Sequence, residues 1–67
     1  RIDEAIVMNI CESRQAASAE SPVSRILYPG EKVRITDQIS GWKKVSLLNL
    51  DEGWMNVDCL TSIDPEM

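Results

Sequence analysis

The sequence predicts an all-β domain, and two observations carry this prediction. Apolar and polar side chains alternate with a period of two in short runs, which is the pattern of strands with one buried face. Val33 and Ile35 alternate in this way in one run, and Val45 and Leu47 do so in the next. Residues typical of turns separate the runs, at 37–41 and at 49–53. We therefore expect residues 30–54 to form a meander of three antiparallel strands.

The segment before the meander predicts two further strands joined by a long loop. The first strand is expected over residues 5–11, with Ile6, Met8 and Ile10 on one face. Residues 12–21 are polar and small, and they are expected to form the loop. They could wind a helical turn, but a helix this short is not stable alone. Pro22 sets a turn, and a strand over 23–28 follows, with Val23 and Leu27 pointing inward.

Three strands, a tight turn and a closing segment follow in order. The strands are expected over 31–37, 41–48 and 53–57, and the tight turn over 58–60. Leu48 and Leu50 flank the expected turn at Asn49, where they form either an exposed apolar tip or ordinary loop packing. We expect one domain over 5–61, with 1–4 as a charged lead-in or linker remnant and 62–67 as an acidic tail.

Glycines and tryptophans mark the starts of the predicted strands. Gly30 enters one strand, and the pairs Gly41-Trp42 and Gly53-Trp54 open the next two. With Met8-Asn9-Ile10 upstream and Asp58-Cys59-Leu60 downstream, this ordered set resembles the bacterial SH3-like (SH3b) domain family over residues 6–60. The resemblance implies a small SH3-like barrel of five to six antiparallel strands. Its expected core comprises Ile10, Val33, Ile35, Val45, Leu47, Trp54 and Leu60.

Charge and composition exclude two classes of partner. The 67 residues carry eleven acidic and seven basic side chains, for a net charge of −4. Nucleic-acid binders need a basic surface, and the one basic cluster here is interpreted as a solvated strand face: Lys32, Arg34, Lys43 and Lys44. No run of about 20 apolar residues is present, so we expect no membrane span.

The sequence lacks the residue types and spacings that catalytic and metal-binding sites usually need. The chain contains no histidine, which is the usual general base and the commonest metal ligand. Asp51 and Glu52 are neighbours, and neighbours on a strand point to opposite faces. Residues 49–53 are similar to the start of a calcium loop, but the later acidic ligand is missing. We therefore predict a non-catalytic domain without cofactor or metal.

Two cysteines, Cys11 and Cys59, are expected to lie near each other, because the chain ends lie side by side in an SH3-like barrel. Either they form a disulfide or they remain free as small core residues. A disulfide would indicate export, so we expect an extracytoplasmic location, at the cell surface or in the periplasm. The chain begins at Arg1, and we expect it to be a piece of a larger multidomain protein.

The resemblance implies a binding or targeting module that recognises a cell-wall peptide or a protein partner. The alternative is a structural or interaction domain that packs against a neighbouring catalytic domain, such as a cell-wall hydrolase, or that mediates protein–protein assembly. The acidic charge favours this alternative, because anionic wall polymers would repel the domain.

The candidate ligand site is a cleft between the 12–21 and 37–41 loops. Trp42 would form its floor, Tyr28 its edge, and Asp37 and Gly41 one wall. The opposing interpretation is that Trp42 is sealed under the first loop. Proline-rich peptides, which eukaryotic SH3 domains bind in a groove lined by aromatic residues, are not expected, because only Trp42 matches one of those groove aromatics.

Overall fold

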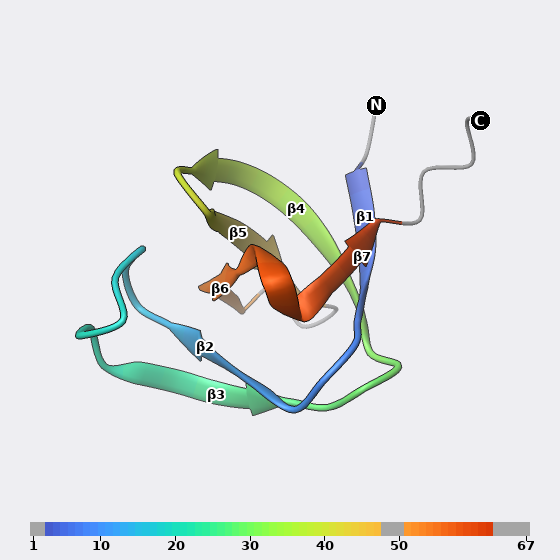
Figure 1. Ribbon diagram of the computed structural model, residues 1–67, viewed down its shortest axis with the longest axis horizontal. Helices are drawn as coiled ribbons and strands as arrows, with labels where there is room; N and C mark the ends of the chain where they lie inside the picture. Colours follow the sequence, from blue (N-terminus) through green and yellow to red (C-terminus); the bar gives the residue numbers. More distant parts are fainter. Residues whose placement is uncertain (1–2, 48–50, 63–67) are drawn as a thin grey trace.

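The computed structural model describes residues 3–47 and 51–62, which form seven antiparallel strands and one short 3-10 helix (Figure 1). The elements are β1 (Asp3–Val7), β2 (Cys11–Arg14), β3 (Val23–Leu27), β4 (Lys32–Ile39), β5 (Trp42–Ser46), β6 (Glu52–Asn56), η1 (Val57–Cys59) and β7 (Leu60–Ser62). The all-β prediction is confirmed, with more strands than expected.

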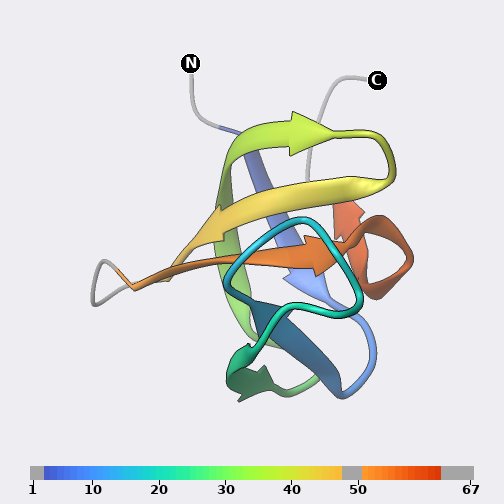
Figure 2. The same cartoon turned by 90° about the vertical axis from the view of Figure 1, so that its left-hand side faces the viewer.

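All of these strands belong to one sheet in the order β3-β2-β6-β5-β4-β1-β7. The sheet curls strongly, so that the β2–β3 hairpin folds in front of β6 (Figure 2). Its two edge strands, β3 and β7, do not pair with each other. The described residues therefore form a curled, open sheet and not a closed barrel.

The predicted meander is present as β4, β5 and β6. A two-residue turn joins β4 to β5, and both of its residues have a positive φ, 37° at Ser40 and 87° at Gly41. Such a turn matches the twist of the flanking strands, and it places Ile39 directly opposite Trp42. Because β4 continues to Ile39, the expected 37–41 loop is reduced to these two turn residues.

The core is small and aliphatic, with contributions from five strands. Its buried side chains are Ala5, Val7, Leu27, Val33, Val45 and Met55. Ile35, Leu47 and Leu60 are partly buried against this cluster together with the two cysteines. The core assignments of Val33 and Val45 are thus confirmed, and those of Ile35, Leu47 and Leu60 are confirmed as partly buried.

The prediction for the first strand was wrong in both its length and its buried face. β1 begins at Asp3, inside the expected lead-in, and ends at Val7, and the chain turns before β2 begins at Cys11. Ala5 and Val7 face the core, whereas Met8 is 50% exposed and Ile10 is 65% exposed. Apolar residues occupy both the odd and the even positions of this segment, so the pattern alone could not show which face of the strand is buried.

The expected inward position of Val23 was also wrong, since that side chain is 41% exposed, while Leu27 is buried as predicted. The register between β2 and β3 shifts next to Arg14, which is paired with Val23. This irregularity breaks the simple alternation on which the prediction depended.

The expected 12–21 loop is strand β2 up to Arg14, and its remaining residues, 15–21, form a connection shaped by one hydroxyl. Ser21 Oγ donates toward the carbonyls of Ala16 (3.0 Å) and Ser18 (2.9 Å) and accepts from the Ala16 N–H (3.3 Å). The Arg14 guanidinium donates to the Ser21 carbonyl at 2.8 Å. These bonds form a compact hairpin end without a helical turn.

The tight turn and the closing segment are present, but the turn lies one residue earlier than expected, at Val57–Cys59, and Leu60 already belongs to β7. η1 is capped by Asn56, whose side-chain oxygen accepts the Asp58 N–H at 2.9 Å. β7 then pairs with β1, so that Val7 lies opposite Leu60. Ser62 belongs to this strand and not to the expected tail. The expected apolar tip at Leu48 and Leu50 and the tail after residue 62 lie outside the described residues.

Candidate functional site

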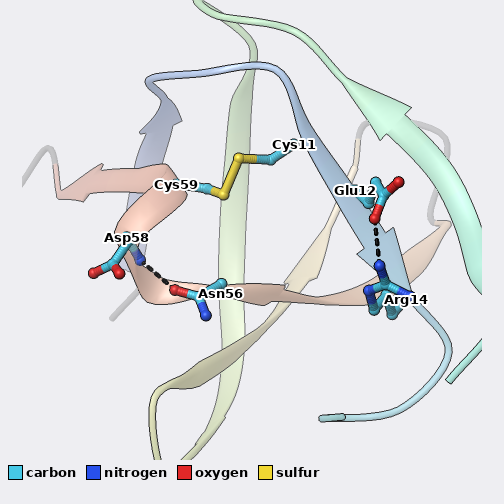
Figure 3. The surroundings of a disulfide bond; sticks show 6 residues. All are labelled: Cys11, Glu12, Arg14, Asn56, Asp58 and Cys59. Atoms are coloured by element: carbon cyan, nitrogen blue, oxygen red, sulfur yellow. Dashed lines mark hydrogen bonds and ion pairs between the residues drawn. A yellow bond between two sulfur atoms is a disulfide. The ribbon is translucent and has the colours of Figure 1, made fainter. Parts of the chain in front are cut away.

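A disulfide between Cys11 and Cys59 closes the end of the sheet where β2 and β6 separate (Figure 3). The two α-carbons are 6.3 Å apart, which confirms the expected proximity. β2 and β6 share one paired position, Arg14 with Trp54. Beyond it, the disulfide ties η1 to the start of β2, and a 2.8 Å hydrogen bond from the Met8 N–H to the Cys59 carbonyl ties η1 to the connection between β1 and β2. The covalent link thus holds the hairpin and η1 in a fixed relation.

Trp42 lies on the side of the sheet that faces away from the core. Its neighbours across the strands are Ile39 on β4 and Asn56 on β6. Trp42 is partly buried, Ile39 is 50% exposed and Asn56 is exposed. The Val57 N–H donates to the Gly41 carbonyl at 3.0 Å, which fixes η1 against the β4–β5 turn. This row offers an indole ring, an apolar side chain and an amide on one rigid surface.

A second row crosses the same face two paired positions along the strands. Its members share register positions on four neighbouring strands: Asp37, Lys44, Trp54 and Arg14. Trp54 therefore stands between two cationic residues, Lys44 and Arg14. Lys44 also forms an ion pair with Glu52 at 3.4 Å, and Arg14 forms one with Glu12. Each cation near Trp54 is thus already held by a carboxylate.

The core assignment of Trp54 was wrong, because the buried residues of β6 are Gly53 and Met55 and the indole lies between them on the other face. Strand parity explains the difference, since neighbours on a strand point to opposite sides. Gly53 is buried because Ser13 of β2 packs on it, which leaves no room for a side chain. The Gly53-Trp54 pair therefore puts its glycine, not its tryptophan, against the core.

Of the predicted ligand residues, three are brought together and one is not. Trp42 follows Gly41 directly, and Asp37 lies on the same face of the adjacent strand. Asp37 accepts the Gln38 N–H at 2.7 Å. Tyr28 is 55% exposed and follows β3, which is separated from β5 by two strands in the sheet order. Tyr28 thus belongs to a different part of the surface.

Neither wall of the predicted cleft has the expected form. One wall is the Ser40-Gly41 turn, and the other is the connection after Arg14 that Ser21 closes. Arg14, Ile39 and Asn56 were not anticipated as site residues. The sequence analysis places Arg14 in the 12–21 loop, so it does not predict that Arg14 pairs with Trp54. The available signal was weak: Glu12 and Arg14 are two residues apart, as are residues on one face of a strand.

The described residues contain no cluster of three or more His, Cys, Asp or Glu side chains that could hold a metal ion. Both cysteines of this part of the chain are in the disulfide, so neither is a free thiol. In residues 3–47 and 51–62, no helix is long and apolar enough to cross a membrane.

No protein-family model matches the chain, and no curated protein and no solved structure is significantly similar to it.

Proposed function

We propose that this chain is a non-catalytic binding module with an SH3-like barrel fold, which recognises a cell-wall peptide or a protein partner at the Trp42 surface. The observation that carries the proposal is the row formed by Ile39, Trp42 and Asn56. An indole ring offers apolar area with a polar N–H, and the NH2 group of Asn56, whose oxygen caps η1, can donate to a peptide carbonyl. The β4–β5 turn and η1 hold this row in place without a ligand.

Connectivity supports the SH3-like part of the proposal. A three-strand meander is followed by a 3-10 turn, and the last strand pairs with the first. The curl of the sheet brings the β2–β3 hairpin back in front of β6 (Figure 2). The Cys11–Cys59 disulfide joins the first residue of β2 to the last residue of η1. This arrangement fits the glycine and tryptophan pattern that carries the resemblance.

The absence of histidine and the lack of a free thiol in the described residues support a non-catalytic role. The disulfide also supports an extracytoplasmic location, because such bonds persist in oxidising compartments. The net charge of −4 argues against nucleic acid as the partner.

The test is co-sedimentation of the purified chain with insoluble peptidoglycan, for wild type and Trp42→Ala. The proposal expects bound protein to fall about tenfold or more in the variant, since aromatic anchors dominate small interfaces. Trp54→Phe serves as the matched control, because it alters the other tryptophan of the same face. Equal sedimentation of wild type and Trp42→Ala would contradict the Trp42 site.

A second candidate function is an interaction domain that packs against a neighbouring domain or mediates assembly. The observation that favours it is a group of exposed large apolar side chains on and beside the β2–β3 hairpin: Met8, Ile10, Val23, Ile26 and Tyr28. Apolar side chains grouped in this way commonly mark protein contacts. Peptidoglycan would then fail to bind the chain, while a domain of the same parent protein would bind it.

A further inference from the structure

Strand β3 is an edge of the sheet with an accessible backbone. In the described part of the chain β3 pairs with β2 on one side and with no strand on the other. Four of its five residues are exposed, and Leu27 alone is buried. In an antiparallel strand, alternate residues direct their N–H and C=O groups away from the paired neighbour. β3 thus presents a set of backbone groups that another extended chain could pair with.

The ends of this free edge are defined by the sequence. Pro22 precedes β3 and Pro29 follows it closely, and proline has no N–H to donate. At the second end, the Tyr28 N–H already donates to the Glu31 carboxylate at 2.9 Å, and the Tyr28 carbonyl accepts the Glu31 N–H at 3.2 Å. The edge open to a partner is therefore Val23–Leu27, which fits an extended segment of about five residues.

An apolar surface runs beside this edge. Glu12 lies opposite Ile26 and Cys11 lies opposite Leu27, and Leu27 faces the core. By strand alternation, Ile26 lies on the outer face of the sheet. Tyr28 follows the end of β3, and Ile10 precedes the start of β2, next to the paired residues Leu27 and Cys11. These three side chains are 41%, 55% and 65% exposed, respectively. An added strand would find backbone partners along β3, the exposed Ile26 side chain on the strand, and the exposed side chains of Ile10 and Tyr28 at its end.

Charge decides the kind of segment that fits. The one basic side chain of β3, Arg25, is paired with Asp51, and the basic residue of β2, Arg14, is paired with Glu12. Glu31 caps the end of the strand and forms no ion pair with a described residue. The whole chain carries a charge of −4, so a second copy would be repelled and a cationic segment would be attracted.

We propose that β3 accepts an extended segment of a partner protein, rich in alternating apolar and basic residues, as an added antiparallel strand. Backbone hydrogen bonds along Val23–Leu27 would hold the segment, while Ile10, Ile26 and Tyr28 contact its apolar side chains. This inference gives the second candidate function its surface and its partner class, and it rests on that function and not on the Trp42 site.

The test is an NMR titration of the isotope-labelled chain with a capped peptide of alternating lysine and valine, about six residues long to match the edge. The expected result is a set of amide shifts over Val23–Leu27 and slower hydrogen exchange of those β3 amides that point away from β2. The same peptide N-methylated at alternate residues should not bind, since it lacks the required N–H groups. A glutamate–valine peptide should bind at least about tenfold more weakly.

Two matched variants test the charge argument. Glu31→Gln keeps an oxygen that can accept the Tyr28 N–H but removes the charge, and it should weaken the lysine–valine peptide about two- to fivefold. Asp3→Asn removes an exposed acid from β1, and it should leave the affinity unchanged. Equal loss in both variants would contradict a local role for Glu31 and overturn the charge argument.

Four results would overturn the proposal as a whole. The first is the absence of β3 shifts at millimolar peptide, and the second is equal binding of the acidic peptide. The third is dimerisation of the chain that Ile26→Lys abolishes, which would assign the edge to a second copy. Trp42→Ala should not change the peptide affinity. The fourth result is loss of peptide binding in Trp42→Ala together with amide shifts in the wild type that are confined to Ile39, Trp42 and Asn56. It would support the Trp42 site and reject the β3 edge.

Discussion

Ser13 of β2 lies directly against Gly53 of β6, so closely that a β-carbon on Gly53 would be 1.8 Å from Ser13 Oγ and 3.2 Å from Ser13 Cβ. Both residues are buried, and their contact seats the β2–β3 hairpin on the meander next to the single paired position of Arg14 and Trp54. Glycine at position 53 is therefore required by close packing and not by backbone conformation.

Gly53→Ala should destabilise the fold by about 1–3 kcal/mol, because the methyl group overpacks the contact with Ser13. Urea unfolding monitored by circular dichroism measures the loss. In a Ser13→Ala background, the Oγ clash is gone and the cost of Gly53→Ala should become smaller. An undiminished cost in that background would mean that Ser13 is not the obstacle.

Removal of the disulfide should destabilise the fold by about 4 kcal/mol in the chain-entropy account, because the bridge spans 48 residues. For a domain of this size the melting temperature should fall by roughly 20 °C. Thermal melts of the wild type and of Cys11→Ala/Cys59→Ala provide the measurement. Intact mass with and without reduction before alkylation checks the bond, and two freely alkylated thiols without reduction would contradict it.

The stability of variants at residue 40 should follow how well each amino acid tolerates a positive φ. Ser40 has a φ of 37°, a region that asparagine tolerates better than serine or alanine. Ser40→Asn should therefore raise the unfolding free energy by about 0.5 kcal/mol, and Ser40→Ala should lower it. Gly41→Ala should cost at least about 1 kcal/mol from conformation alone, since open space surrounds its added methyl group. Any other order in urea unfolding would contradict this turn geometry.

Ser21→Ala should loosen the connection between β2 and β3 while leaving the core intact. The Ser21 hydroxyl forms hydrogen bonds with backbone groups of Ala16 and Ser18. A typical hydrogen bond contributes about 1 kcal/mol net to the free energy of unfolding. Amide exchange at residues 16–21 should become faster, while the exchange of Val33 and Val45 shifts only with global stability. Ser18→Ala is the milder comparison, because the Ser18 hydroxyl makes one bond, from the Glu20 N–H. Unchanged exchange after Ser21→Ala would contradict the role of that hydroxyl.

Met55→Ala should cost more stability than Trp54→Ala, although tryptophan is the larger residue. Met55 is fully buried and its truncation should cost about 2–5 kcal/mol, whereas Trp54 is partly buried on the outer face. Chemical unfolding of both variants provides the comparison. A larger loss of unfolding free energy in Trp54→Ala would indicate that the indole is a core residue, as predicted from the sequence.

The all-β class and the meander could be predicted from the sequence because both depend on local chemistry. Alternation at Val33, Ile35 and Val45 marks strands that each bury one face, and Ser40-Gly41 supplies the positive φ values of a tight turn. The proximity of Cys11 and Cys59 followed from the resemblance, and the pairing of β1 with β7 accounts for it.

The tertiary structure decided which parity is buried, which segments pair and which site residues meet. Residues 5–10 carry apolar side chains on both parities, and packing selected Ala5 and Val7 over Met8 and Ile10 because Val33 and Leu60 lie opposite them. Arg14 reaches Trp54 through a long-range pairing, and no local pattern encodes a partner forty residues away. Trp42 and Tyr28 were grouped by residue type, yet the sheet order separates their strands. Local alternation specifies strands, but the energy that chooses a face and a partner comes from burying those strands against one another.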